Sequence, residues 1–285
     1  MKSIDDRNTS AGEPRMHQPC HSALSAASPA SPLAAAREAA SSSALRSCAA
    51  CGMHRLCLPT GLDEADMKRL DKIIGRRKVA RDDFLYRIGD RFNALYAVRV
   101  GHFKTYQENL DGDRQITGFQ MPGELLGMDA ISTELHQCDA VALQDSEVCE
   151  IPFARLEQLF GQIPMLLRHF HRIMSHEITS EQNVIMLLGN MRAEQRFAAF
   201  LVNLSSRYAA RGYSSTRFQL RMTRQDVGNY LGLTIESISR LISKFRKQGL
   251  LAVEQRDIEV MDLPALKKLA AGVDACAVPG APSAS

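Results

Sequence analysis

The sequence lacks any long apolar run, and it also lacks a strong net charge. No stretch of its 285 residues approaches the roughly 18 to 20 consecutive apolar side chains that a membrane-spanning helix requires. We therefore expect no membrane span. Because 35 lysines and arginines nearly balance 32 acids, the formal charge of +3 gives only weak support for a polyanionic partner.

The cysteine pattern of a disulfide framework is also missing. Seven cysteines are an odd number, and the first residues do not form a secretory signal, so we expect reduced thiols and a cytoplasmic location. The sequence shows no nucleophile–base pair, phosphate-binding loop or paired acidic site. We therefore predict that the protein is not an enzyme.

The composition is that of a globular chain with loose ends. Hydrophobic residues make up 45% and charged residues 24%, and the length is enough for two ordinary domains. Alanine and serine fill 18 of the 27 positions from 21 to 47, which bury too little surface to order the chain. This pattern predicts a flexible arm over 1–46 and a flexible tail over 272–285.

Regular glycine spacing marks the first folded part, residues 47–161. Gly89, Gly101, Gly112 and Gly123 follow one another at intervals of 12, 11 and 11 residues, separated by short apolar runs. Short strands with turn signals at this spacing are typical of all-β domains, and the residues around Gly112 suit a tight hairpin. The pattern predicts an antiparallel β-barrel or jelly roll within an α+β protein.

A single long helix is predicted over residues 162–190. Its stripe recurs every three or four positions and consists of Leu167, Phe170, Met174, Ile178, Glu181, Ile185 and Leu188. The helical pattern runs for about 25 residues from Pro164, which gives about 37 Å at 1.5 Å per residue. Such a helix is long enough to link two domains and to pair with a copy of itself. The alternative is an amphipathic helix that packs only on its own domain.

Positive charge is concentrated near the C-terminus, in a predicted domain over 191–271. Residues 190–256 contain twelve lysines and arginines against four acids, so this stretch carries +8 and the rest of the chain about −5. A basic domain joined to a mildly acidic one is typical of nucleic-acid binding. A basic surface that only faces solvent is the alternative.

Within the basic domain, the local signals predict a winged helix-turn-helix. A capping box that begins at Thr223 starts one helix at Arg224, and Gly232 allows the tight turn that follows. Thr234 then caps a second helix. Residues 250–260 look like a hairpin wing. Two ordinary packed helices are the alternative interpretation.

The second helix separates apolar and polar faces. The polar face carries Glu236, Ser239, Arg240 and Ser243, and it starts in the first turn, as in helices that enter the major groove. Arginine pairs with guanine and glutamate accepts from cytosine, so Arg240 and Glu236 are the predicted base readers. Lys244, Arg246 and Lys247, together with the two serines, suit phosphates, which position a protein without reading sequence.

Three cysteines lie close together at the start of the β-domain. The spacing Cys48-x2-Cys51-x5-Cys57 can surround one metal centre, which then needs a fourth ligand. Zinc and an iron–sulfur cluster both suit thiolate ligands, and structural or redox-active thiols are the alternative. The candidates for the fourth ligand are Cys149, Cys138, Cys20, Cys276 and His54.

Several motifs resemble the FNR group of the CRP/FNR transcription regulator family. The resemblance runs from about Cys48 to about Ala271. The motifs that carry it are residues 95–99 (LYAVR), 115–119 (QITGF), 148–153 (VCEIPF) and 228–240 (GNYLGLTIESISR). Together these motifs are specific.

The resemblance implies an oxygen-sensing transcription regulator. Its cofactor would be a 4Fe-4S cluster held by Cys48, Cys51, Cys57 and Cys149, the last chosen over Cys138 because it lies in the 148–153 motif. The resemblance also implies a homodimer that binds double-stranded DNA at palindromes of TTGAT half-sites and recruits RNA polymerase when oxygen is absent. A relative that responds to haem, nitric oxide or a zinc/thiol redox switch is the alternative.

Individual positions acquire expected roles from the same resemblance. Glu236, Ser239 and Arg240 match the residues that read DNA. Glu181 matches an acid that opposes dimerisation, since two like charges meeting at a dimer seam repel each other. Gly112 lies in a hairpin that relatives use to contact RNA polymerase.

One departure from the family argues against control by cyclic AMP. Relatives that bind cyclic nucleotides place an arginine–serine pair after a Gly-Glu-Leu motif to hold the phosphate. Here the motif is present at Gly123, but Gln137 and Cys138 stand where the pair belongs. We therefore do not expect cyclic AMP as a ligand.

Overall fold

The computed structural model describes residues 47–108 and 112–272. The predicted flexible arm over 1–46 lies outside these residues, as does the predicted tail apart from Gly272. Two of the candidate fourth ligands, Cys20 and Cys276, also lie outside the described part of the chain. Among the described residues, no helix combines the length and the apolar character needed to cross a membrane.

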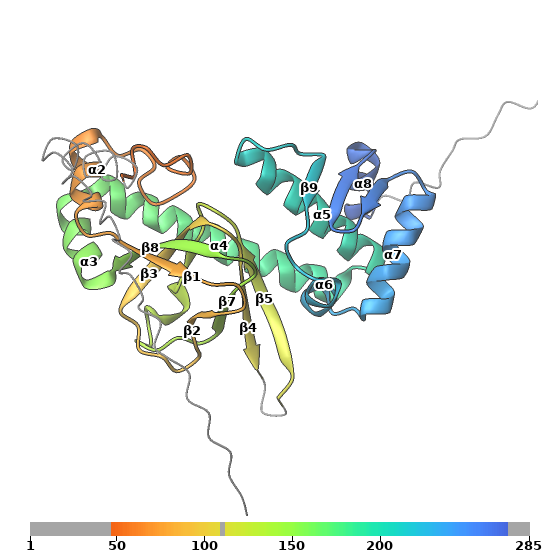
Figure 1. Cartoon of the computed structure of the whole chain (residues 1–285), viewed down its shortest axis with the longest axis horizontal. Coiled ribbons are helices and arrows are strands. Elements are labelled where there is room, and N and C mark those ends of the chain that lie inside the picture. Colours follow the sequence, from red (N-terminus) through yellow and green to blue (C-terminus); the bar gives the residue numbers. More distant parts are fainter. Residues whose placement is uncertain (1–46, 109–111, 273–285) are drawn as a thin grey trace, which may run out of the picture. The chain divides into compact units, whose positions relative to one another are not determined.

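The first half of the described chain is a jelly roll of two antiparallel sheets. Its strands are β1 (Gly75–Val79), β2 (Phe84–Tyr86), β3 (Ala94–Val100), β4 (Phe103–Glu108), β5 (Arg114–Gln120), β6 (Leu125–Leu126), β7 (Asp139–Ala142) and β8 (Ser146–Pro152). One sheet has the order β1-β8-β3-β6 and the other β2-β7-β4-β5, and β1, β8 and β3 lie side by side in Figure 1. The predicted β-fold is confirmed as a jelly roll rather than a closed barrel.

Helices cover this roll at its ends. They are α2 (Glu64–Asp71), the 3-10 turn η1 (Met128–Ala130), α3 (Phe153–Gln162) and α4 (Pro164–Asn190). The long helix predicted from the apolar stripe is therefore present, and Pro164 stands at its first turn, where its missing N–H costs no hydrogen bond. The first half of α4 packs into the core through Leu166 and Phe170, whereas Ile178 and Ile185 in its second half are exposed.

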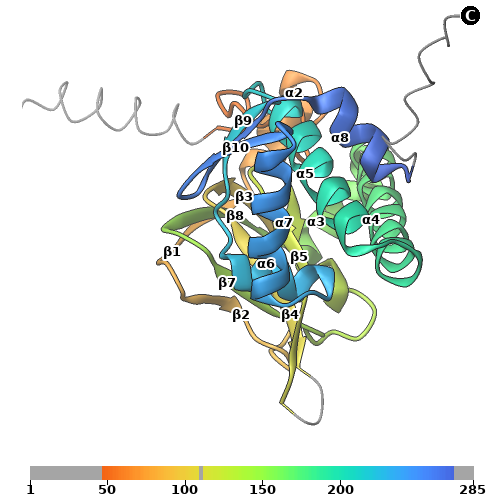
Figure 2. The same cartoon turned by 90° about the vertical axis from the view of Figure 1, so that its right-hand side faces the viewer.

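The second half of the described chain is a winged helix-turn-helix. Its elements are α5 (Ala193–Ala210), β9 (Arg217–Gln219), α6 (Arg224–Leu231), α7 (Ile235–Lys247), β10 (Leu251–Glu254), β11 (Asp257–Val260) and α8 (Leu263–Ala270). The capping box at Thr223 is formed, Gly232 adopts the left-handed φ of 62°, and the Thr234 side chain caps α7. Figure 2 shows α7 facing the viewer next to α5 and α6.

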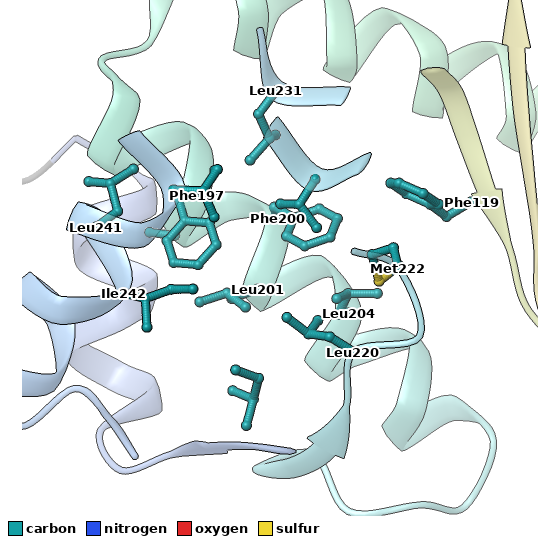
Figure 3. Packing of buried hydrophobic residues seen from close by; sticks show 14 of the residues in the cluster. Phe119, Phe197, Phe200, Leu201, Leu204, Leu220, Met222, Leu231, Leu241 and Ile242 are labelled. Carbon is teal, nitrogen blue, oxygen red and sulfur yellow. The ribbon is translucent and has the colours of Figure 1, made fainter. Parts of the chain in front are cut away.

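A core of buried apolar side chains holds α7 against α5. Phe197 of α5 and Phe245 of α7 are both 0% exposed, and their ring centroids lie 5.6 Å apart. Figure 3 shows Phe197 facing Leu241 and Ile242 of α7. Ile238, Leu241, Ile242 and Phe245, the predicted inward face, are all buried, so the opposite face of α7 is left to solvent.

Candidate cysteine centre and DNA-reading helix

Consecutive turns bring three cysteines into one loop. We call residues 47–62 the cysteine segment; it contains neither helix nor strand. The amide of Cys51 donates to the carbonyl of Cys48 at 3.1 Å, and the amide of His54 donates to the carbonyl of Cys51 at 3.1 Å. The Cys57 carbonyl accepts from the Thr60 hydroxyl at 2.7 Å. Each turn therefore folds the chain back before the next cysteine.

Asp71, at the end of α2, anchors the start of the cysteine segment. One carboxylate oxygen accepts from the Cys48 amide at 2.9 Å, and the other accepts from the Ser47 hydroxyl at 2.8 Å. At the other end, Leu58 is completely buried in the core beside α4. The sequence offered no sign of the Asp71 contact, because 23 residues separate Cys48 from its partner.

Cys149 of β8 lies with the cysteine segment. It belongs to the same core cluster as Leu58, with Cys57 packed against that cluster. Arg76 is the strand partner of Cys149 across β1 and β8, and its guanidinium donates to the Cys149 sulfur at 3.3 Å. Strand register decides this contact, so sequence patterns did not reveal Arg76.

The other candidate ligands are engaged elsewhere. The Cys138 thiol donates to the Asp129 carboxylate at 3.6 Å and belongs to a different core cluster from Cys149. His54 has its Nδ1 2.8 Å from the carbonyl of Cys51. Of the fourth ligands considered within the described residues, Cys149 is therefore the one that shares a core with Cys57.

Three of these thiols, Cys48, Cys57 and Cys149, have pKa values raised above the ordinary range. Burial is the main cause that raises the pKa of Cys57 to about 12, and the nearby Cys149 adds to the shift. Burial also raises the pKa of Cys48, helped by Asp71, and that of Cys149, against the opposing effect of Arg76. A metal centre formed here must therefore displace thiol protons.

The geometry of these thiols is not that of a ready site for one metal ion. Across residues 47–108 and 112–272, no three His, Cys, Asp or Glu side chains stand close enough together to hold a metal ion as they are. The sulfurs nevertheless influence one another, since Cys48 is affected by Cys57 and Cys149.

The stripe predicted for dimerisation divides along α4. Ile178 is 54% and Ile185 69% exposed, and Glu181 between them is also exposed. Leu167, Met174 and Leu188 are half-buried. Phe170 is only 4% exposed, and its ring lies 5.1 Å from that of Phe160. Phe170 therefore belongs to the core of its own domain, and we leave it out of the proposed dimer face.

The predicted base readers lie on the open face of α7. Glu236 and Arg240 are exposed, and Ser239 is half-buried. Hydrogen bonds from its own backbone amide and from Thr234 lower the pKa of Glu236, so its carboxylate is ionised and can accept a hydrogen bond. The Ser243 hydroxyl donates to the carbonyl of Ser239 at 3.0 Å.

Lys244 and Gly112 are two other predicted contact residues, for DNA and for RNA polymerase respectively. Lys244 forms an ion pair with Glu194 near the start of α5, so a phosphate there competes with an acid for the ammonium group. The sequence did not reveal this pair because the two residues are 50 positions apart. Gly112, between β4 and β5, is exposed and has a positive φ of 83°, which favours glycine.

A partly buried ion-pair group links the turn before β6 to α5. The Glu124 carboxylate accepts from Arg207 at 2.6 Å and from Arg211 at 2.6 Å. Burial opposes ionisation of Glu124, but the two guanidinium groups outweigh it and hold the pKa below its ordinary value. Next to it, a side chain at Gly123 would stand 3.1 Å from Leu56 of the cysteine segment. Sequence reasoning found the Gly-Glu-Leu motif but neither arginine.

Two family models match the chain. Residues 76–162 match a cyclic nucleotide-binding domain, and residues 195–269 match a Crp-like helix-turn-helix domain. The first match covers most of the jelly roll and α3, and the second covers the domain that contains α6 and α7. Together they leave out the cysteine segment and all of α4.

Similar proteins in several bacteria extend over both halves of the chain. The fumarate and nitrate reduction regulatory protein of Escherichia coli K12 is 47% identical over 221 residues, which is 77% of this chain and 88% of that protein. The transcriptional regulatory protein btr of Bordetella pertussis is 46% identical over 227 residues, 79% of this chain and 93% of the relative. The transcriptional activator protein Anr of Pseudomonas protegens is 44% identical over 223 residues, 78% and 91% respectively.

Among solved structures, FixK2 from Bradyrhizobium japonicum is similar in fold. Its TM-score is 0.64 at 28% sequence identity, and the match covers 69% of this chain and 97% of FixK2. A CooA mutant from Carboxydothermus hydrogenoformans matches with a TM-score of 0.58 at 18% identity, over 70% of this chain and 88% of CooA. At that identity, the second match supports the fold alone.

Proposed function

Because the chain belongs to the CRP/FNR family of transcription regulators, we propose that it is an oxygen-responsive regulator that uses a 4Fe-4S cluster as its cofactor. In this proposal a homodimer binds TTGAT-type palindromes in the cytoplasm and recruits RNA polymerase when oxygen is absent. The protein is a DNA-binding transcription regulator and not an enzyme. The observation that carries the proposal is the shared core of Cys57 and Cys149.

The donor set suits an iron–sulfur cluster. Cys48, Cys51 and Cys57 come from one irregular loop, and Cys149 comes from a rigid strand beneath it. Thiolates are the preferred ligands of such clusters, and the positive charge of Arg76 beside Cys149 favours the thiolate form. Bound there, the cluster would supply the chemistry that reacts with oxygen.

The dimer face is proposed on the second half of α4. Ile178 and Ile185 offer exposed apolar area, while Glu181 lies between them with no apolar cover. Two copies of Glu181 brought together in a dimer would repel each other, so the dimer would be marginal. A marginal equilibrium is the kind that a modest change at the cysteine segment can shift.

DNA reading is assigned to the exposed face of α7. Arg240 and Glu236 are proposed to contact base edges, with Ser239 beside them, while Ser243 and Lys244 are proposed to contact phosphates. Because Ile238 and Phe245 fix the inner face of the helix in the core, the polar side chains stay in place. The exposed turn at Gly112 is the proposed contact with RNA polymerase.

The surroundings of Gln137 support the view that cyclic AMP is not the effector. The side-chain N–H of Gln137 donates to the Leu135 carbonyl at 2.7 Å, and the backbone N–H of Gln137 donates to the Asp129 carboxylate at 2.7 Å. An acid therefore stands close to the position where a phosphate would need a cation. The ring of His136, the residue before Gln137, stacks on that of Tyr86 with the centroids 3.7 Å apart.

The cofactor can be tested with cysteine variants purified without oxygen. We expect the wild-type protein to contain iron and sulfide and to bind a TTGAT palindrome in fluorescence anisotropy. Cys57→Ala should be colourless, and its affinity should fall to the non-specific level, about a thousandfold weaker or more. Cys138→Ala is the matched control, because it changes another buried thiol outside this core.

The ultraviolet-visible spectrum of the same samples separates the alternatives. A sharp haem band, or a colourless wild-type protein that contains zinc, would support a family member with another effector. Unchanged DNA affinity in Cys57→Ala would show that the proposed cluster plays no part in DNA binding.

A further inference from the structure

A histidine of α4 contacts the cysteine segment directly. The Nε2 atom of His169 lies 3.2 Å from the carbonyl oxygen of Cys57. A carbonyl can only accept a hydrogen bond, so the ring must donate from Nε2, which assigns the tautomer. The same carbonyl accepts from the Thr60 amide at 3.1 Å and from the Thr60 hydroxyl at 2.7 Å. His169 therefore binds the turn that follows Cys57.

Apolar packing holds the same turn against the same helix. Leu58 follows Cys57 and is 0% exposed, and it shares a core cluster with Leu166 and Phe170 of α4. His169 lies next to Phe170 in sequence, so the polar contact stands beside the apolar one. A displacement of Cys57 by ligation or by loss of a ligand must therefore strain one contact, the other or both.

The rest of α4 extends from this contact to exposed residues. Ile178 and Ile185 lie 9 and 16 residues after His169 in one continuous helix. At 1.5 Å per residue, the distance along the axis is about 14 to 24 Å. A helix without a break carries a shift at its first half to its second half, where the proposed dimer face lies.

We propose that His169 is a positioning residue that couples the state of the cysteine segment to dimerisation through α4. This inference rests on the proposed function, since it assumes that the cysteines hold a cluster and that α4 forms the dimer. What the inference adds is the residue that makes the link, because His169 donates a hydrogen bond to the Cys57 carbonyl.

The test compares variants that keep or remove the donor. His169→Leu removes the hydrogen bond while retaining bulk, and His169→Gln retains a side-chain N–H near the position of Nε2. His171→Leu is the matched control, because His171 is exposed on the same helix. His169→Ala repeats the test without the bulk of leucine.

Two measurements are made on each protein. The first is iron and sulfide content together with the dimerisation constant from sedimentation, before and after chelation of the iron. His169→Leu should keep its iron, but the ratio of the two dimerisation constants should shrink about three- to tenfold, as expected for one lost hydrogen bond. His169→Gln and His171→Leu should resemble the wild-type protein.

The second measurement uses the metal-free protein. We expect iodoacetamide to alkylate Cys57 about three- to tenfold faster in His169→Leu than in His171→Leu, because the turn opens more often. Equal alkylation rates and an unchanged dimerisation ratio would overturn the inference while leaving the proposed cluster intact. If the wild-type protein contains no iron, or if its dimerisation constant does not change when the iron is chelated, the proposed function and this inference are both overturned.

Discussion

The helix-turn-helix and the cysteine segment reach their structures in opposite ways. The turn between α6 and α7 depends on neighbours in sequence, namely the cap at Thr223, the glycine at 232 and the cap at Thr234. The cysteine segment depends on residues far away, namely Asp71, Arg76 and His169. The comparison shows that the helix-turn-helix is locally encoded, whereas the cysteine segment is assembled by tertiary contacts.

The two regions also differ in how much apolar surface supports them. α7 places four side chains in a core that includes Phe197. The cysteine segment is irregular, and only Cys48, Leu58 and Pro59 of its 16 residues are buried. Segments with few buried contacts open locally at low cost. We therefore expect the cysteine segment to respond to ligation while α7 keeps its shape.

The largest effect is expected from removing the central ring of α7. Phe245→Ala should lower the free energy of unfolding by about 3 to 5 kcal/mol, because it deletes a completely buried phenyl group. Urea denaturation followed by circular dichroism measures this change. Lys247→Ala, on the exposed side of the same helix, should stay within about 0.5 kcal/mol. A small effect at Phe245 would show that α7 does not depend on this core.

The next effect concerns the two kinds of DNA contact that we propose for α7. Arg240→Ala should weaken binding to the TTGAT palindrome by about 1 to 3 kcal/mol and relax the preference for that sequence. Lys244→Ala should weaken binding to all sequences alike and reduce the salt slope by about one. Anisotropy titrations on the palindrome and on a substituted site, at several salt concentrations, separate the two. Equal loss of specificity in both variants would contradict the assignment.

A third prediction concerns the ion-pair group beside the cysteine segment. Its members are largely buried, with side-chain exposures of 30% for Glu124, 24% for Arg207 and 4% for Arg211. Glu124→Gln should lower the free energy of unfolding at pH 7 by about 1 to 2 kcal/mol, because the arginines lose their counter-charge. Urea denaturation at several pH values measures it.

The pH dependence of this effect has a definite sign. The fold lowers the pKa of Glu124, so its ionised form favours the folded state. That contribution is complete above the ordinary carboxyl pKa and is lost as the pH falls through the lowered value. The difference in the free energy of unfolding between the wild-type protein and Glu124→Gln should therefore shrink in acid. A difference that stays constant from pH 7 to acid would mean that charge is not the cause.

The smallest global effect is expected at the anchor of the cysteine segment. Asp71→Ala removes the acceptor of Cys48 and Ser47, yet it leaves the cores untouched, so the free energy of unfolding should fall by about 1 kcal/mol or less. Alkylation of Cys48 in the metal-free protein should nevertheless become several-fold faster. Asp66→Ala on the same helix is the control, because its carboxylate contacts Arg69 and not the cysteine segment.

Much of the fold follows from the sequence, because periodicity and caps act over short distances. The helix from Pro164 to Asn190 is predicted over 162–190, and the helix that begins after Thr234 is predicted from its cap. The division of the stripe on α4 was not predicted, since periodicity shows which side chains share a face but not what covers that face. Phe170 has the helical spacing of the predicted dimer stripe, but its side chain is buried in its own domain.

For this protein, the sequence alone determined the helix-turn-helix, the turn chemistry of the β-roll and the set of cysteines. Caps, glycines and side-chain periods are properties of neighbouring residues, and they are readable before folding. Only the tertiary structure decided that Cys149 lies with Cys57, that Arg76 contacts its sulfur, and that His169 joins the cysteine segment to α4. Those contacts depend on strand register and helix packing, which bring together residues far apart in the chain.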